Sequence, residues 1–372
     1  MHLPPPEIVV TGMGLASSIG SSVAEGFDCL MKGGPCFGAV IPYELSRLLR
    51  VPKNQKFLSC SARHLMWAGL RALEQSGWTR ETLLAERTAI FTGSGQVGLE
   101  PSQIFPGFRA AHTSEGQADW AALGGPASRL LDPFFPLRAL SNSGLALLAM
   151  EVGARGPSNN FVQSDTAGAH ALDAAIAGLQ ESLCDVALAG AFDSLLTPAN
   201  ELNYRRMGLL SPTGCLRPFD GTADGVVLGE AGVALALERK VDAEARGALI
   251  LAGIALDDGL TRPDFIVAAG HGVSGLDLQE AADLDRSVSC TAFKGLTGYL
   301  GAATGLVEVA LAIAALQARV VPAVVGLSQI ATGVELNLMM KSERLPGNRL
   351  VSARCLSRSW LGQTAAINVV SY

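Results

Sequence analysis

The chain has 372 residues and a formal net charge of -6, and 49% of its residues are hydrophobic whereas only 17% are charged. It contains no basic cluster, which argues against a nucleic-acid role. Its start lacks a basic region followed by an apolar run, and its longest apolar stretch, residues 300–316, is short for a span and interrupted by Glu308. These features predict a cytoplasmic protein without a membrane span, and the scarcity of charge predicts a large face buried against a partner.

The apolar pattern predicts strands that alternate with helices, which is typical of an α/β fold. The first expected strand lies within 8–20 and ends in a Gly/Ser turn, and the others are 88–92, 160–163, 184–190, 232–238, 248–255 and 265–270. The expected helices are 23–32, 61–76, 140–152, 169–179 and a buried helix within 300–316. The remaining long segments, 33–60 and 97–130, are expected to be loop-rich and irregular.

The seven cysteines show no CxxC pair and no paired spacing. They are interpreted as single buried thiols in a reducing compartment, and neither a metal site nor a cofactor of the chain's own is predicted. They are Cys29, Cys36, Cys60, Cys184, Cys215, Cys290 and Cys355.

The junction between the expected strand 160–163 and helix 169–179 has the geometry that suits a catalytic nucleophile. Ser164, Asp165 and Thr166 are candidates to cap the helix with their side chains. A strand that runs into a helix points free backbone N–H groups at one spot, where they would activate a thiol and hold an oxyanion. Gly168 stands at that spot and offers no side chain for attack.

Several motifs together resemble the β-ketoacyl synthase family. In that family an Asp-Thr-Ala sequence precedes the catalytic cysteine, and here Asp165, Thr166 and Ala167 precede Gly168. Further matches, in the family's order, are residues 7–14 (EIVVTGMG), 153–158 (GARGPS), 210–220 (LSPTGCLRPFD) and 224–230 (DGVVLGE). The resemblance implies a thiolase-like fold with five layers, αβαβα, built from two similar halves. Residues 1–240 would form the half with the strand–helix junction in which Gly168 replaces the cysteine. Residues 241–372 would form the half with the His271 and Lys294 motifs.

The resemblance also locates the remaining positions of the family's active site. His271 matches the first catalytic histidine, but Tyr299 stands where the second should be. Lys294 and Glu308 match the family's lysine and glutamate pair, here interpreted as a buried structural ion pair. His271 is interpreted as a core histidine. Because Gly168 replaces the cysteine, no catalytic residue is expected in this chain.

Other departures concern the substrate side of the site. After His271, Val273 and Gly275 replace the two threonines that contact the carrier's phosphopantetheine arm in the family. Asp277 and Glu280 match an acidic pair, and Trp360 occupies the place of a phenylalanine gate.

A cysteine-free member of this family resembles a chain length factor, the ketosynthase-like subunit of type II polyketide systems. The resemblance implies a heterodimer with a cysteine-bearing ketosynthase, in which this chain shapes the partner's acyl tunnel. The complex would use a phosphopantetheine-bound acyl carrier protein. Gly168, rather than glutamine, favours the subset that acts on aryl polyene chains. The expected tunnel residues, with ordinary core as the alternative for each, are Phe134, Phe135, Leu145, Leu148 and Ala149.

Two alternatives stay open at this point. One is an enzyme of altered chemistry, a decarboxylase or acyltransferase that uses His271 and Tyr299. The other is a homodimeric protein that binds an acyl carrier or an acyl chain without a ketosynthase partner.

Overall fold

The computed structural model describes residues 7–95, 101–256 and 262–372. Eleven of its strands form one mixed sheet in the order β10-β8-β7-β12-β13-β6-β1-β5-β4-β2-β3, and β9 pairs with β11 separately. The strands are β1 Ile8–Ser17, β2 Thr88–Ser94, β3 Ser158–Val162, β4 Val186–Ser194, β5 Glu230–Arg239, β6 Ala252–Leu256, β7 Phe265–Val267, β8 Ser289–Thr291, β9 Val320–Val321, β10 Asn337–Leu338, β11 Glu343–Arg344, β12 Ser352–Arg358 and β13 Thr364–Val370.

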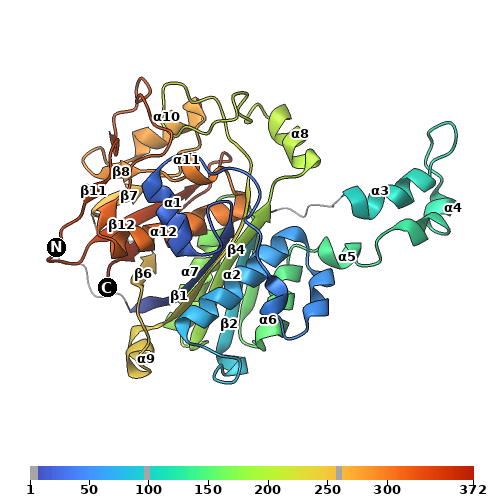
Figure 1. The fold of residues 1–372 in the computed structure, drawn as a ribbon, viewed down its shortest axis with the longest axis horizontal. Helices are drawn as coiled ribbons and strands as arrows, with labels where there is room; N and C mark the ends of the chain where they lie inside the picture. The colour runs from blue at the N-terminus through green and yellow to red at the C-terminus, as the bar shows by residue number, and fades with distance from the viewer. Residues whose placement is uncertain (1–6, 96–100, 257–261) are drawn as a thin grey trace.

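Helices lie on both faces of this sheet (Figure 1). The α-helices are α1 Val23–Lys32, α2 Cys60–Ser76, α3 Pro101–Ala110, α4 Trp120–Leu123, α5 Phe135–Arg138, α6 Ser143–Val152, α7 Ala167–Gln180, α8 Pro198–Arg206, α9 Lys240–Ala245, α10 Ser274–Asp283, α11 Lys294–Thr297 and α12 Thr304–Gln317. The short 3-10 helices are η1 Leu45–Arg47, η2 Pro52–Phe57, η3 Ala85–Arg87, η4 Ala127–Leu130 and η5 Gly301–Ala303.

The order of the strands repeats in the two parts of the chain. Outward from the antiparallel β1–β6 contact, one part runs β1-β5-β4-β2-β3 and the other β6-β13-β12-β7-β8. Once the two-residue strands β9–β11 are set aside, each part places its first strand innermost, followed by its last, penultimate, second and third. This is the duplicated α/β unit of a thiolase-like fold. A division at residue 240, between β5 and β6, stays a prediction.

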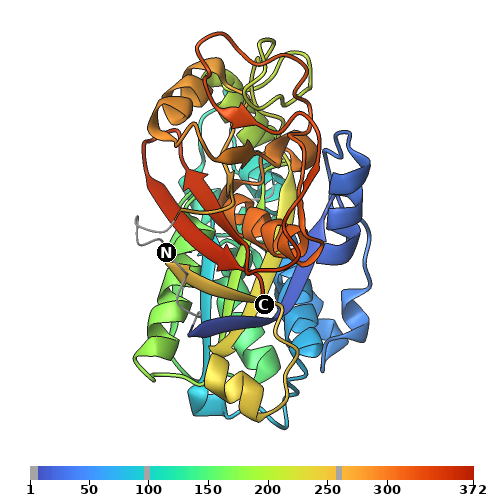
Figure 2. The ribbon, with the colours of Figure 1, turned by 90° about the vertical axis from the view of Figure 1, so that its left-hand side faces the viewer.

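The layers follow from where the helices pack. Helix α2 covers β1, β5 and β4 on one side, while α7 and α12 lie in the middle and contact strands of both halves. Ala281 of α10 belongs to the core on the far side of β7 and β8. Figure 2 shows most of the C-terminal half, in orange and red, above the N-terminal half. Because α12 is enclosed by other elements, it is apolar all round and buried except at Gln317.

Several expected elements differ from the structure. The helix expected at 140–152 begins at Ser143, and the strand expected at 248–255 begins at Ala252. The prediction of irregular structure at 97–130 is wrong for its described part, which contains α3, α4 and η4. Pro106 and Gly107 inside α3 weaken the helical signal in the sequence.

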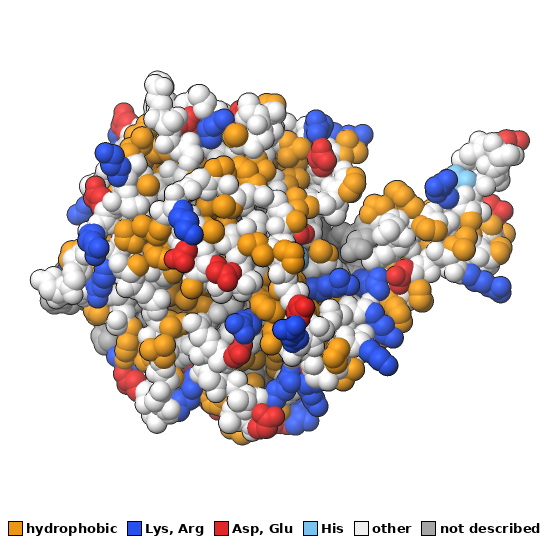
Figure 3. Space-filling model, viewed as in Figure 1, with side chains coloured by type: hydrophobic (Ala, Val, Ile, Leu, Met, Phe, Trp, Pro, Cys, Tyr) orange, Lys and Arg blue, Asp and Glu red, His pale blue; other side chains and the backbone are white. Residues whose placement is uncertain are grey.

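The segment from α3 to α5 forms an arm, residues 101–140, that stands out from the body (Figure 1). Figure 3 shows many hydrophobic side chains on its surface. Large exposed apolar residues of this arm are Phe105, Phe108, Trp120, Leu130, Leu137 and Leu140, of which Trp120 is 74% exposed. Among the described residues, no helix combines the length and apolarity needed to cross a membrane.

Candidate functional site

The site is built around the junction between β3 and α7. Thr166 is the N-cap residue of α7, with φ −87° and ψ −8°, but its side chain does not cap the helix. Its hydroxyl donates instead to Gln163 Oε1 at 3.0 Å. The prediction of an N-cap among Ser164, Asp165 and Thr166 is therefore confirmed at Thr166, although its side chain does not cap the helix.

Gly168 is buried in the first turn of α7, where its Cα faces three neighbours. A Cβ atom placed on Gly168 would lie 3.0 Å from Leu306 Cβ, 3.1 Å from Ala191 Cβ and 3.3 Å from the carbonyl oxygen of Ala302. Such contacts are tighter than ordinary van der Waals packing, so any side chain here requires its neighbours to shift. The place of the family's cysteine therefore has room for a Cβ only if these neighbours give way by a few tenths of an ångström, and Gly168 itself offers no side chain for nucleophilic attack.

Asp165 forms the polar centre of the site. Tyr299 donates its hydroxyl to Asp165 Oδ2 at 2.9 Å, and His271 Nε2 lies 3.4 Å from Asp165 Oδ1. All three residues are buried, each with at most 1% of its surface exposed. Burial, and next the charge of Asp165, hold the pKa of Tyr299 well above its usual value, so its hydroxyl keeps its proton. Of these residues, sequence reasoning singled out His271 and Tyr299 but missed that both converge on Asp165.

An aromatic cluster covers this polar centre. The ring of Trp360, which is partly exposed, lies 4.8 Å from that of Tyr299 and 6.3 Å from that of His271, between centroids. Tyr204 contacts Trp360 edge-on at 5.3 Å. Aromatic rings packed edge-on or tilted in this way cover the hydrogen bond between Tyr299 and Asp165 with apolar surface. Trp360 therefore lies directly against His271 and Tyr299, at the position that the resemblance assigns to the gate.

The acidic residues of α10 hold the loop that carries His271. Asp277 Oδ1 accepts from the backbone N–H of His271 at 2.8 Å, and its Oδ2 accepts from the N–H groups of Phe219 and Gly272. Glu280 accepts from the N–H groups of Ala269 and Gly270, which precede His271. Burial raises the pKa of Asp277 to about 6 although these hydrogen bonds oppose the shift. The carboxylates fix the backbone rather than act on a substrate.

Lys294 and Glu308 lie together in the interior, 3.1 Å apart and almost completely buried. Lys294 Nζ also donates to the backbone carbonyl of Ala269. Burial raises the pKa of Glu308 to about 7 although the charge of Lys294 opposes the shift. Burial lowers the pKa of Lys294, but the charges of Glu308, Asp165 and Glu280 and the hydrogen bond to Glu308 together outweigh it, so that the pKa is raised overall. The pair is enclosed on all sides, as a structural ion pair would be.

The five expected tunnel residues do not share one environment. Leu148 is 0% exposed and packs in the core beside Gly69 of α2, so internal packing occupies its side chain. Leu145 and Ala149 pack partly buried on the same core. Phe134 and Phe135 are partly buried at the base of the arm, and the ring of Phe134 lies 5.0 Å from that of Phe57.

The cysteines are less uniform than expected. Cys184, Cys290 and Cys355 are buried, but Cys29, Cys36 and Cys215 are only partly buried. Cys60 is exposed and lies beside His64 and Glu230, in the one group of three possible metal ligands found within the described ranges. The prediction that all seven thiols are buried is wrong for these four.

Comparison with known proteins identifies the family of this chain. Residues 47–243, more than half of the chain, match the model of the β-ketoacyl synthase N-terminal domain. The chain belongs to the β-ketoacyl synthase family. It is 28% identical over 274 residues to 3-oxoacyl-acyl-carrier-protein synthase I of Hordeum vulgare, an alignment that covers 67% of this chain and 56% of that relative.

A second relative and a solved structure match over a larger share of their length. The chain is 27% identical to a putative polyketide β-ketoacyl synthase 1 of Streptomyces halstedii, covering 85% of this chain and 86% of the relative. The structure of the ishigamide ketosynthase/chain length factor superposes with a TM-score of 0.81 at 22% identity, over 99% of both chains. The latter match establishes the thiolase-like ketosynthase fold.

Proposed function

We propose that this chain is a non-catalytic chain length factor that pairs with a cysteine-bearing ketosynthase and shapes its acyl tunnel in type II polyketide biosynthesis. The observation that carries the proposal is the packing at Gly168, where not even a Cβ fits without displacement of Leu306, Ala191 or Ala302. Condensation needs a thiolate to hold the acyl group and N–H donors for the developing enolate. A ketosynthase fold that has neither the cysteine nor the second histidine serves best as the subunit of a pair that shapes the tunnel, and aryl polyene systems are the first in which to test it.

The edge of the sheet supports pairing with a second subunit. Strand β3 ends the sheet, with β2 as its only neighbour among the described strands. Ser158, Asn159 and Val162 on β3 are exposed. An unprotected edge strand offers its backbone N–H and C=O groups to another strand. We infer that β3 pairs with the equivalent strand of the ketosynthase.

The arm supports the same proposal from a different surface. Its apolar side chains, with Trp120 the most exposed, are costly to leave in water, and patches of this kind mark protein interfaces. The arm would lie along the ketosynthase, with Phe134 and Phe135 at its base near the partner's tunnel. The acyl carrier protein and its phosphopantetheine would serve the complex, and this chain would need no cofactor for that role.

The first experiment is the composition of the native particle. The chain is co-expressed with the cysteine-bearing ketosynthase encoded nearest to it, purified by a tag on this chain alone, and measured by native mass spectrometry. A one-to-one heterodimer is expected. A homodimer that ignores the ketosynthase would overturn the proposal, as would turnover of an acyl thioester by this chain alone that is lost in His271→Ala.

The arm provides a matched pair of variants for this measurement. Trp120→Ser removes an exposed aromatic from the arm, whereas Leu249→Ser removes a similarly exposed residue, 71% exposed, from the body between α9 and β6. Trp120→Ser is expected to weaken recovery of the ketosynthase and Leu249→Ser to leave it unchanged. Equal recovery with both variants would exclude the arm from the interface.

The shaping role has its own readout. In the reconstituted complex, Phe134→Ala is expected to change the length of the product, because a growing chain stops where it meets packed atoms. Unchanged product length in Phe134→Ala, Phe135→Ala and Leu145→Ala, each with the heterodimer intact, would contradict the shaping role of these residues.

A further inference from the structure

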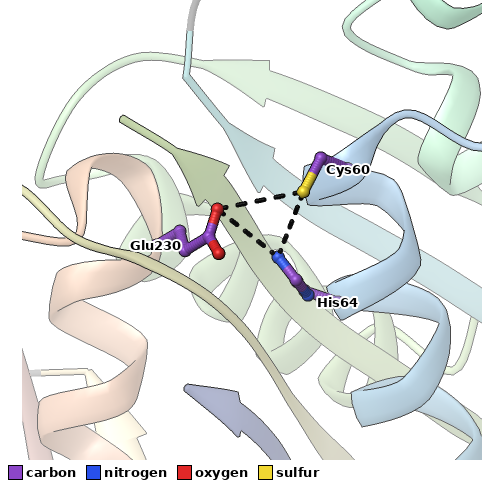
Figure 4. A group of neighbouring side chains, drawn as sticks. All are labelled: Cys60, His64 and Glu230. Carbon is purple, nitrogen blue, oxygen red and sulfur yellow. Dashed lines mark hydrogen bonds and ion pairs between the residues drawn. The ribbon is translucent and has the colours of Figure 1, made fainter. Parts of the chain in front are cut away.

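A second polar cluster lies outside the site described above, at the start of α2. Cys60 is the first residue of α2, and His64 follows one turn later on the same face. Glu230, the first residue of β5, reaches the same spot from 170 positions further along the chain than Cys60. Figure 4 shows the three side chains pointing toward one another across the gap between helix and strand.

The spacing of the three ligand atoms is close to that of a bound metal ion. Cys60 Sγ lies 3.7 Å from His64 Nε2 and 3.9 Å from Glu230 Oε2, and the last two atoms are 3.7 Å apart. Tetrahedral zinc, with bonds of about 2.0–2.3 Å, holds neighbouring ligand atoms about 3.3–3.6 Å apart. The distance between the histidine nitrogen and the carboxylate oxygen is too long for a hydrogen bond. A contraction of a few tenths of an ångström would complete a coordination triangle.

The partners behind the ligands match those of known metal sites. His64 Nδ1, the nitrogen turned away from the cluster, shares a hydrogen bond of 2.6 Å with the Tyr43 hydroxyl. Glu230 Oε2 accepts from Ser194 Oγ at 2.6 Å, and its Oε1 accepts from the backbone N–H of Val40 at 3.2 Å. Metal-bound histidines and carboxylates are usually oriented by such outer hydrogen bonds. Here Tyr43 leaves Nε2 as the nitrogen that faces Cys60 and Glu230.

The exposure of the three residues also suits a metal ion that is bound at the protein surface. His64 and Glu230 are buried, whereas Cys60 is exposed. An ion bound between them would therefore meet protein on one side and solvent on the other. A mixed sulfur, nitrogen and oxygen set on three protein residues is a donor combination that zinc accepts, and it leaves a fourth position for water.

We propose that Cys60 Sγ, His64 Nε2 and Glu230 Oε2 together bind one zinc ion, with a water molecule in the fourth position. On binding, the Cys60 thiol gives its proton to solvent and coordinates as thiolate, so that uptake releases a proton and weakens as the pH falls. The ion joins the first turn of α2 to the start of β5. This site is independent of the proposed pairing with a ketosynthase and would exist in the isolated chain as well.

The test titrates cobalt(II), and then zinc(II), into the full chain prepared free of metal. Cobalt is expected to bind once per chain and to give the thiolate-to-cobalt charge-transfer band and the strong visible absorption of a four-coordinate ion. Zinc is expected to displace it. Cys60→Ser should remove the charge-transfer band, and Cys215→Ser, which changes another partly accessible thiol, should leave it intact.

Two further variants separate a metal site from a network that only stabilises the fold. His64→Asn is expected to abolish tight zinc binding. Tyr43→Phe keeps all three ligands and is expected to weaken zinc affinity about 10–100-fold, with circular dichroism unchanged. If cobalt gives no charge-transfer band, or gives the same band in Cys60→Ser, the proposal is overturned.

Discussion

The two central helices, α7 and α12, are counterparts in the two halves of the molecule. Each has 14 residues, each follows the third strand of its half, and each carries glycine at its second position. Their sequences, AGAHALDAAIAGLQ and TGLVEVALAIAALQ, end almost identically. A Cβ on Gly168 of α7 would press on Leu306 of α12. A Cβ on Gly305 of α12 would clash first with the Ser357 hydroxyl of β12, and it would lie 3.1 Å from the carbonyl oxygen of Asp165 just before α7.

The comparison shows how closely the two glycines are packed. Gly305 is needed above all because Ser357 of β12 lies against it, with the backbone of Asp165 next. Gly168 has looser surroundings, since a Cβ there would meet Leu306, Ala191 and Ala302 at 3.0–3.3 Å. The helices differ in buried charge, because α12 carries the buried Glu308 where α7 carries Ala171, whereas the acidic residue of α7, Asp173, is only partly buried. That difference, and the packing at Gly168, can each be tested.

The largest effect is expected from removing Lys294, the ion-pair partner of Glu308 on α12. Lys294→Met leaves Glu308 buried without its partner and is expected to cost about 3–5 kcal/mol of unfolding free energy. Chemical denaturation of the full chain measures this loss. The double variant Lys294→Met/Glu308→Leu should regain most of it, and a single variant as stable as the wild type would show that the pair is not needed.

A smaller effect is expected from restoring the family's cysteine. Gly168→Cys should lose about 1–3 kcal/mol of unfolding free energy, because its Cβ meets Leu306, Ala191 and Ala302. Gly168→Ala is the matched control, with the same Cβ and no thiol. Neither variant is expected to form an acyl-enzyme with an acyl thioester, as followed by intact mass. A stable Gly168→Cys variant that becomes acylated would show that the position has kept its catalytic geometry.

The smallest effect concerns Asp193, which accepts the backbone N–H of Ala302 beside Gly168. Burial raises the pKa of Asp193 from 3.8 to about 6, so the folded state binds its proton more tightly than the unfolded state. The stabilisation of the folded state by protonated Asp193 is therefore complete below pH 3.8 and is lost as the pH rises to about 6. The unfolding free energy falls by at most about 1.4 kcal/mol per pH unit over this range. Between about pH 4.5 and 6, the unfolding free energy of Asp193→Asn should therefore fall less than that of the wild type.

Asp185 supplies the control for this pH dependence. Hydrogen bonds from Arg87 hold the pKa of Asp185 at about 2, so it stays ionised in the folded state throughout the same range. Asp185→Asn should keep the wild-type slope. If Asp193→Asn also keeps it, Asp193 is not the group that titrates.

Sequence reasoning worked where the signal is local. Helix α1 spans Val23–Lys32 as its apolar spacing predicts, and the apolar run near residue 300 contains the buried helix α12. In the arm, Pro106 disrupts the helical pattern of α3, and the exposed apolar residues show no simple periodicity because no core within the chain selects for one. Periodicity reports burial, so it gives little signal where apolar side chains are exposed rather than packed in a core.

The polar sites were predictable only in part, because their members are far apart in the chain. The family motifs locate Gly168, His271 and Tyr299, but nothing local shows that Asp165 accepts from a residue 134 positions away. Cys60 and His64 are four residues apart at the start of a helix, and this spacing alone places both side chains on one face, where they could bind the same ion. Glu230 completes that set only after β5 is placed beside α2.

The position of β13 in the sheet determines when the C-terminal part of the sheet can be completed during synthesis. Strand β5 fills the gap between β1 and β4, so the N-terminal part of the sheet can close once Arg239 has emerged from the ribosome. In the C-terminal part the gap between β6 and β12 is filled by β13, the last strand in the sequence. Until Thr364–Val370 arrive, β6 and β12 each present an open edge to the cell. A nascent chain stalled before β13 would leave the C-terminal part of its sheet unfinished, with both of these edges open to association with other strands.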